Sequence, residues 1–395
     1  MLPLEGIKIV DLTRVLSGPY CTMILGDFGA DIVKIETPGT GDDSRAYGPY
    51  QNGESAYYNS INRNKKSVTV DTRNPKGCDL IREMVAKADM VVENFKPGTM
   101  EKLGLGYEDL KKINPEIIYV AISGFGHTGP YSKRPAYDAV VQAMGGIMSI
   151  TGPGPGQYTR VGSSVGDITA GLFAALGAIL AVVEKQKTGK GQKVDIAMLD
   201  CQVAILENAI ARYFVSGKVP QPAGNRHASL TPFQDFECKD GVKVMIAVGN
   251  NGLWKKFLTF AGHPELIEDP RFINNPDRTN NYDQLFPILD EIFHTKTAQE
   301  WYDGLVAASV PVTLVNTIDK VVTNEQVLSR DMILEVDQPV LGKFRMANTP
   351  IKMSGTPGGL RMPAPLLGAN TDEVLKSFLG KTDAEIQALK DENVL

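Results

Sequence analysis

The chain of 395 residues has few of the residues that build metal centres or disulfide frameworks. Its four cysteines, at positions 21, 78, 201 and 238, form no CxxC pair, and its four histidines show no HExxH or other metal-ligand spacing. Basic residues do not outnumber acidic ones, and the net charge is −5 at pH 7. We therefore expect reduced thiols, no bound metal, and no general affinity for nucleic acid or anionic membranes.

The sequence also lacks a recognisable membrane anchor or secretory signal. The N-terminus has no charged stretch followed by an apolar one. The longest apolar run, 168–183, is shorter than the roughly 20 residues that span a bilayer. These absences predict a soluble, cytoplasmic protein.

The composition, 43% hydrophobic and 22% charged, is sufficient for one large core or two moderate ones. The first 120 or so residues alternate β-rich runs with helical patterns, which is typical of βα units. Expected strands lie at 7–12, 31–36, 90–93 and 117–123, and expected helices at 19–28, 75–88 and 107–113. Repeated βα units predict an α/β fold whose parallel sheet is covered by helices and binds ligands at the carboxyl ends of its strands.

The later sequence predicts a second, smaller domain. The run 168–183 is apolar on nearly all sides, which favours a helix buried in the core and ended by Gly189, and 194–198 returns as a strand. From about residue 219 prolines lead into a segment with a strand at 242–248 and aromatic-bearing helices. We expect a large domain over 1–200, a linker over 201–225, a small α+β domain over 226–316, and a linker and returning large-domain segment over 317–395.

The most informative local feature is VGSSVGDITAG, residues 161–171, in which a turn of small residues leads to Asp167 at the start of the apolar helix. An aspartate at the N-cap would meet free N–H groups and the positive end of the helix dipole, so its carboxylate should stay ionised even when desolvated. Aspartate is also a common N-cap without any catalytic role. From spacing alone, the plain capping interpretation is the better one.

Other motifs are weaker. GPGPG at 152–156 and TGKGQ at 188–192 lack the spacing of nucleotide-binding loops, and they are interpreted as ordinary loops. His227 has no identifiable acid or nucleophile partner. None of these predicts a site.

Several long segments together resemble the family III CoA-transferases. They are RVLSGPYCTMILGDFGADIVKIE (14–36), NRNKKSVTVD (62–71), ENFKPG (93–98), SGFGHTGP (123–130), PAYD, VGSSVGD, KTGKGQKVDIAMLD, GNRH (224–227) and APLLGANTDEVL (364–375). The resemblance covers essentially the whole chain. It implies that Asp167 is a nucleophile, that the large domain is Rossmann-like and built from N- and C-terminal segments, and that two chains form an interlocked-ring homodimer.

The resemblance implies a reaction in which coenzyme A moves from an acyl-CoA donor to a carboxylic acid through an aspartyl anhydride and an aspartyl-CoA thioester. Coenzyme A enters as a substrate, and no tightly bound cofactor is expected. A carboxylate suits this chemistry because it is ionised at neutral pH without a partner base. The residues that the resemblance assigns to CoA binding are Leu16, Ser17, Val70, Asp71, Thr72, Arg73, Asn94, Phe95, Lys96, Lys102, Pro135, Ala136, Tyr137 and Asp138.

The sequence departs from the formyl-CoA type of the family. Those members carry an Arg after the KIE strand and a Gln in the first loop, where this chain has Thr37 and Leu16. The resemblance therefore favours members acting on acetyl-CoA or succinyl-CoA and small dicarboxylates such as oxalate or glutarate. Arg14 and Arg226 are candidates for holding the acceptor's second carboxylate. A flexible lid is expected at Gly249, Asn250, Asn251 and Gly252, with a plain turn as its alternative.

Two other functions stay open at this point. An α-methylacyl-CoA racemase would share the fold and need a His and Asp pair for proton transfer, for which His127 is the candidate. A non-catalytic CoA-thioester binding protein would need no nucleophile at all.

Overall fold

The computed structural model describes all 395 residues and divides into two compact units, which we describe separately. The large unit comprises Met1–Ile147, Arg160–Phe214 and Glu325–Leu395, and the small unit comprises Met148–Thr159 and Val215–Asn324. The division differs from the predicted domains in three respects. Residues 148–159 join the small unit, that unit begins at Val215 and not at residue 226, and it ends at Asn324 and not at residue 316.

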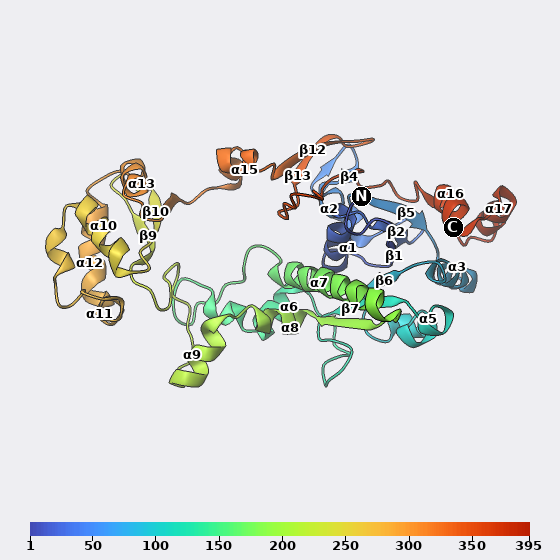
Figure 1. Ribbon diagram of the computed structural model, residues 1–395, viewed down its shortest axis with the longest axis horizontal. Coiled ribbons are helices and arrows are strands. Elements are labelled where there is room, and N and C mark those ends of the chain that lie inside the picture. The colour runs from blue at the N-terminus through green and yellow to red at the C-terminus, as the bar shows by residue number, and fades with distance from the viewer. The chain divides into compact units, whose positions relative to one another are not determined.

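The centre of the large unit is a six-stranded parallel sheet in the order β5-β2-β1-β6-β7-β8 (Figure 1). This confirms the predicted α/β class with a parallel sheet. The strands are rich in Val and Ile because both of their faces are covered by helices. Their bounds are β1 Lys8–Asp11, β2 Asp31–Glu36, β5 Lys65–Thr69, β6 Met90–Glu93, β7 Ile118–Ser123 and β8 Lys193–Ala197.

Two hydrophobic clusters cover the two faces of this sheet. One cluster is formed with α3 (Pro75–Val85), α5 (Tyr107–Ile113), α16 (Thr371–Val374), a π-helical turn (Leu375–Leu379) and α17 (Asp383–Asp391). The other is formed with α1 (Ser17–Asp27), α6 (Asp138–Met144), α7 (Val165–Thr188) and α8 (Met198–Ala204). The C-terminal segment thus completes the core of the N-terminal one.

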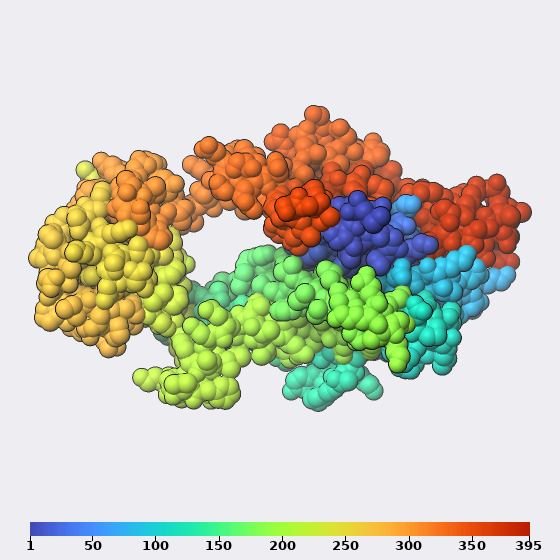
Figure 2. Space-filling model, in the orientation of Figure 1, coloured from blue at the N-terminus to red at the C-terminus, as the bar shows by residue number.

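Helix α7 has two different apolar faces. Its small side chains, such as Ala170, Ala174 and Ala178, are fully buried in the core. The opposite face is uncovered, because Leu176 is 52% exposed and Leu180 is 60% exposed; the green atoms of α7 lie at the surface of the large unit in Figure 2. The predicted burial of this helix in the core is therefore confirmed for one of its faces and not for the other.

By length and composition alone, α7 would also suit a membrane span, with a mean hydropathy of 2.0 in its most apolar window. This is weak evidence, because a core helix meets the same criteria and one face of α7 packs in the core. The helix ends as predicted, with Gly189 at its C-cap in the left-handed region.

The remaining elements of the large unit are short and mostly peripheral. A hairpin of β12 and β13 is followed by a stretch in which Arg361 and Met362 bond Asn64, so the returning chain is fixed to the N-terminal segment. The bounds are η1 Asp43–Ala46, β3 Tyr50–Gln51, β4 Glu54–Ser55, α2 Ala56–Ile61, α4 Thr99–Lys102, α15 Glu325–Ser329, β12 Ile333–Gln338 and β13 Gly342–Ala347, with η2 Ile147–Ile150 and α9 Asn208–Ser216 crossing the boundaries of the two units.

The small unit is α+β, with a three-stranded antiparallel sheet in the order β11-β10-β9. Its core is aromatic, and Trp254, Phe257, Phe293 and Trp301 are among its buried members. The bounds are β9 Phe233–Glu237, β10 Lys243–Ala247, α10 Asn251–Ala261, η3 Pro264–Ile267, α11 Asn275–Asn280, α12 Tyr282–Phe293, α13 Ala298–Ala307, β11 Val312–Leu314 and α14 Ile318–Val321.

Candidate active site

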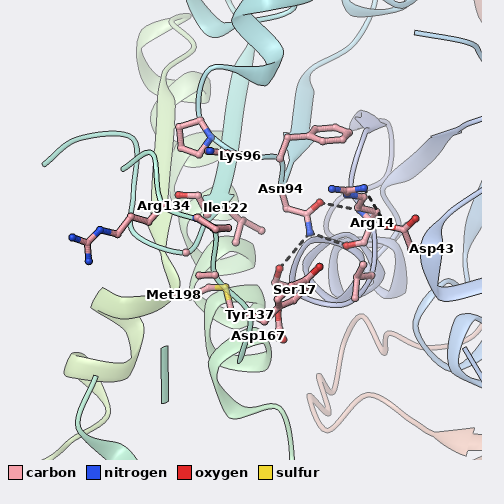
Figure 3. A pocket seen from close by; sticks show the side chains of 17 residues that line it. Arg14, Ser17, Asp43, Asn94, Lys96, Ile122, Arg134, Tyr137, Asp167 and Met198 are labelled. Carbon is pink, nitrogen blue, oxygen red and sulfur yellow. Dashed lines mark hydrogen bonds and ion pairs between the residues drawn. The ribbon is translucent and has the colours of Figure 1, made fainter. Parts of the chain in front are cut away.

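A cavity of about 210 Å³ opens where β1, β6, β7 and β8 end, at the edge of the sheet where a parallel α/β fold binds its ligands. Figure 3 shows side chains from these strand ends and from the start of α7 facing one another. The cavity is lined by Arg14, Val15, Ser17, Asp43, Asn94, Phe95, Lys96, Pro97, Ile122, Ser123, Gly124, Arg134, Pro135, Ala136, Tyr137, Asp167 and Met198. Seven of the predicted CoA-binding residues and Asp167 therefore share one cavity.

Asp167 lies in the first turn of α7, not at its N-cap. The helix begins at Val165, and Ser164 is the N-cap. The predicted cap position was wrong by three residues, because the preceding turn of Gly162, Ser163 and Ser164 lets the helix begin earlier than the apolar run. The carboxylate is half-buried and contributes to the cavity wall.

The surroundings of Asp167 disfavour its charge more than the sequence suggested. Burial, and after it the nearby Asp138 carboxylate, raise the pKa of Asp167 from 3.8 to about 6, while a hydrogen bond from the Ser17 hydroxyl acts in the opposite direction. The pKa of Asp167 is therefore raised, although the sequence led us to expect a helix start that favours the charged form. With a pKa near 6, about nine-tenths of the groups are still ionised at pH 7.

Asp138 is fixed by the start of α7. One of its carboxylate oxygens accepts the Gly166 N–H at 2.8 Å, and the other accepts from the Gln142 side-chain amide at 2.7 Å. A Cβ on Gly166 would come within 2.7 Å of Val141, so only glycine permits this approach. Asp138 thus satisfies one of the free N–H groups of α7 beside Asp167, and it does not line the cavity.

Tyr57 is a neighbour of Asp167 that the sequence did not reveal. Burial raises the pKa of its phenol to about 12, and the negative charge of Asp167 is the next contribution. Tyr57 follows the strand β4 in α2, where no motif marks it. Only the packing of α2 near α1 brings this ring close to the carboxylate.

The loop after β1, residues 12–16, has an unusual backbone; we call it the β1 loop. Val15 has φ of +66°, a conformation that costs a β-branched residue on the order of 1–3 kcal/mol. Its N–H donates to the Asp42 carboxylate at 3.0 Å, while the Asn94 side chain bonds both the N–H and the C=O of Arg14, at 2.9 and 2.7 Å. Figure 3 shows Asn94 between Arg14 and Ser17.

A buried ion pair lies beneath this loop. The Lys34 ammonium is 2.8 Å from the Asp42 carboxylate, and the two side chains are 0% and 1% exposed. Burial alone would raise the pKa of Asp42, but the charge of Lys34 and hydrogen bonds hold it well below its usual range. A lysine between Val33 and Ile35 in the strand DIVKIE was the sequence signal that a buried pair was present.

Three cationic side chains contribute to the cavity wall. Arg14 is exposed and forms an ion pair with Asp43 at 3.1 Å. Lys96 is also in the wall, and Arg134, which the sequence prediction omitted, places its guanidinium 3.7 Å from the ring centre of Tyr131. The cavity therefore offers positive charge to an anionic ligand around one half-buried carboxylate.

Other predicted CoA-binding residues lie elsewhere in the large unit. Leu16 and Val70 are buried in hydrophobic clusters, so their side chains do not face the cavity. Arg73 forms an ion pair with Asp71 just after β5, which is an edge strand of the sheet, and Thr72 lies between them in the sequence. Lys102 is exposed at the end of α4.

The remaining predicted acceptor and lid residues belong to the small unit. The Arg226 guanidinium lies 4.1 Å from the ring centre of Tyr282. The segment 249–252 is the start of α10, where the Asn250 side chain caps the helix by accepting the Leu253 N–H and Asn251 accepts from the buried Arg278. The segment is therefore a capped helix start, with Gly249 before the cap and Gly252 in the first turn. A movement of this segment as a lid stays a prediction.

His127 is not placed for proton transfer in the cavity. Its side chain is nearly buried, its Nδ1 lies 2.9 Å from the Lys193 ammonium, and its Nε2 lies 3.6 Å from Glu93. It is absent from the cavity wall. Burial and the charge of Lys193 lower the pKa of His127, and burial raises the pKa of Glu93 to about 7. The acid–base pair that a racemase would need does not face Asp167.

The chain is similar over nearly its full length to known CoA-transferases. Residues 4–371 match the sequence model of the family described as CoA-transferase family III. The succinyl-CoA:glutarate CoA-transferase of Homo sapiens is 41% identical over 395 residues, which are 100% of this chain and 90% of the human protein. The acetyl-CoA:oxalate CoA-transferase of Acetobacter aceti is 41% identical over 354 residues, covering 89% of this chain and 90% of that one.

The fold is also found in a solved structure. A CAIB/BAIF family protein from Brucella suis superposes with a TM-score of 0.84 and 38% identity, covering 95% of this chain and 99% of the other.

Proposed function

The chain belongs to family III of the CoA-transferases, and on that premise we propose that it moves coenzyme A from an acyl-CoA to a small dicarboxylic acid with Asp167 as the nucleophile. The observation that carries this proposal is the placement of one half-buried carboxylate in a cavity lined by cations at the carboxyl ends of the strands. A carboxylate with a pKa near 6 is mostly ionised at neutral pH yet poorly solvated, which favours nucleophilic attack.

The reaction proceeds through three covalent states of Asp167, which are two mixed anhydrides and the aspartyl-CoA thioester between them. An oxygen of the carboxylate attacks the donor thioester carbon, the C–S bond breaks, and coenzyme A leaves as a thiolate. The thiolate then attacks the Asp167 carbonyl carbon of the mixed anhydride, which releases the donor acid and leaves an aspartyl-CoA thioester. The acceptor carboxylate attacks this thioester, and the released thiolate attacks the acceptor's acyl carbon in the new anhydride. The acceptor departs as its CoA ester, and Asp167 is a carboxylate again.

The test is a covalent adduct. Protein mixed with succinyl-CoA, digested and analysed by mass spectrometry should carry coenzyme A on the peptide containing Asp167. Asp167→Asn should carry none and should lose at least about a thousandfold in kcat, because the nucleophile is removed. Incorporation of solvent deuterium at the α-carbon of an acyl-CoA without an adduct would contradict transfer and favour racemisation. Binding of coenzyme A with neither reaction would favour a binding protein.

A dicarboxylate acceptor is supported by the names of the relatives, which act on glutarate and oxalate. Arg14 is suited to the second carboxylate because it lines the cavity and an arginine fork binds carboxylates bidentately. Its ion pair with Asp43 would have to be exchanged for one with the acceptor. Arg14→Leu should raise KM for glutarate or oxalate about tenfold or more and leave KM for a monocarboxylate nearly unchanged. Equal effects on both acids would contradict the assignment.

Arg226 is the second candidate, and the same comparison tests it. Arg226→Leu should discriminate against dicarboxylates if its side chain meets the acceptor. Lys255→Leu, which removes another cation from the small unit, is the matched control and should affect neither acid.

For the CoA moiety, we propose contacts with the predicted residues in the cavity, and phosphate contacts with Lys96, Lys102 and Arg73. Lys96→Ala or Lys102→Ala should raise KM for the acyl-CoA and leave kcat nearly unchanged, because phosphate binding is equal in the ground and transition states. A fall in kcat alone would contradict this role.

We also propose that the protein works as a homodimer, as the resemblance implies. The uncovered face of α7 supports this, since Leu172, Leu176 and Leu180 are each roughly half exposed and form an apolar stripe one turn apart. A second copy of the chain would cover it. Light scattering should give the mass of a dimer, and Leu176→Asp with Leu180→Asp should give a monomer or unassembled chain. Val242→Asp, at a half-exposed valine of the small unit, should remain dimeric. A monomeric wild-type protein would contradict the proposal.

A further inference from the structure

We propose that Lys34, Asp42 and Asn94 are positioning residues that hold the β1 loop in the strained conformation required for the reaction at Asp167. This inference rests on the proposed nucleophilic role of Asp167. It adds the residues that determine how the wall of the cavity next to that carboxylate is shaped.

The conformation of the β1 loop is not one that its own sequence favours. Val15 has φ of +66°, a region that glycine enters freely and that a β-branched residue avoids. No glycine occurs between Asp11 and Ser17. The surrounding structure must therefore impose this backbone.

Three consecutive residues of the loop are each bonded by a side chain from another element. The Lys34 ammonium, from β2, donates to the Thr13 carbonyl at 2.7 Å. The Asn94 side chain, from the end of β6, bonds the Arg14 N–H and C=O. The Asp42 carboxylate, from the loop after β2, accepts the Val15 N–H at 3.0 Å. Together these contacts leave the loop little freedom to relax.

Stability alone does not explain the buried ion pair. Lys34 and Asp42 are withdrawn from water almost completely, and such a pair is often no more stabilising than apolar residues of the same volume. Each partner also bonds the backbone of the β1 loop. The pair therefore has a geometric role. It holds the Lys34 ammonium where it donates to the loop and the Asp42 carboxylate where it accepts from the loop.

The loop leads directly into the surroundings of Asp167. Arg14 and Val15 line the cavity, and Ser17, which begins α1, hydrogen bonds to Asp167 and also receives a long contact from Asn94 at 3.4 Å. A Cβ on Gly171 would come within 2.7 Å of the Ser17 carbonyl oxygen, so α1 and α7 are in close contact here. Relaxation of Val15 would move Ser17 relative to the carboxylate.

The experiment is a double-mutant cycle between Asp42→Ala and Val15→Gly, with succinyl-CoA and glutarate as substrates. Asp42→Ala should lower the rate of adduct formation at Asp167 and kcat, with little change in KM. Val15→Gly serves as the second background, because glycine adopts the same φ without strain, and each loss is measured relative to the protein with the same residue at position 15. In the Val15→Gly background the loss caused by Asp42→Ala should be about 5- to 100-fold smaller. Rescue of this kind would not follow from a merely structural role.

Asp27→Asn is the matched control, since it breaks the buried pair of Asp27 with Arg63 at the other end of α1. It should lower the melting temperature and leave kcat per folded protein unchanged. If Asp42→Ala does not fold, Asn94→Ala replaces it in the same cycle, because Asn94 is only half-buried.

Equal losses in the wild-type and Val15→Gly backgrounds, or a loss in Asp27→Asn as large as in Asp42→Ala, would overturn the positioning role. A wild-type protein that forms no adduct would instead contradict the nucleophilic role of Asp167, so the two failures are distinguishable.

Discussion

Replacing Asp167 by asparagine should make the protein more stable while removing its activity. The pKa of the carboxyl rises from 3.8 to about 6 in the folded protein, which corresponds to a penalty of about 3 kcal/mol for the ionised form. A raised carboxyl pKa leaves the folded state unpenalised below pH 4 and destabilises it progressively as the pH rises through 6. Asparagine carries no charge at any pH and still offers an oxygen to the Ser17 hydroxyl.

The expected result is a pH-dependent difference between the two proteins. At pH 8 the melting temperature of Asp167→Asn should exceed that of wild type by about 5 °C, and at pH 4 the two should agree to within about 1 °C. Differential scanning calorimetry at several pH values measures this difference. The large unit contains the substitution, so its transition should move while that of the small unit stays fixed, if the two are resolved.

Asp71→Asn provides a control of opposite sign. The side chain of Arg73 lowers the pKa of Asp71, so its loss should leave the protein no more stable at any pH. If Asp167→Asn is less stable than wild type at pH 8, or if its advantage does not depend on pH, the carboxylate is not desolvated in the way that the structure indicates.

Two further predictions concern neighbouring acids. Glu93→Gln should raise the melting temperature above pH 7 and not below pH 5. Burial raises the pKa of Glu93 to about 7, so the ionised form is penalised in the folded protein. Calorimetry over this pH range measures the difference, and a change that does not depend on pH would contradict the prediction. Ser17→Ala should move the acidic limb of the kcat/KM profile to higher pH, and Asp138→Asn should move it to lower pH, because one removes a hydrogen bond to the Asp167 carboxylate and the other removes a neighbouring negative charge. Shifts in the same direction would contradict the roles assigned to these groups.

Local sequence patterns predicted much of the large unit. The strand at 90–93 and the helix at 107–113 match β6 and α5 residue for residue, and the apolar run at 168–183 lies inside α7. These segments were predictable because hydrophobic periodicity reports which face of an element is buried. The same reasoning failed for α7 as a whole, since a leucine on an uncovered face looks the same in sequence as one in the core.

The proposed nucleophile was identified by its motif and not by its chemistry. VGSSVGD resembles a family segment, and from it Asp167 was singled out before the fold was known. Its acidity depended on Asp138 and Ser17, which lie 29 and 150 positions earlier in the chain, and on burial that local spacing does not encode. The same limit explains why Leu16 was predicted to bind CoA while its neighbour Val15 lines the cavity.

The sequence by itself determined the class of fold, the family and the residue on which the chemistry is proposed to occur. Only the tertiary structure decided which side chains share the cavity, how far Asp167 is desolvated, and that Val15 is held in a strained backbone by Lys34, Asp42 and Asn94. The physical reason is that helices and strands follow from contacts between residues a few positions apart. A pKa, a buried ion pair and an imposed dihedral angle follow from groups that only the packing of distant segments brings together.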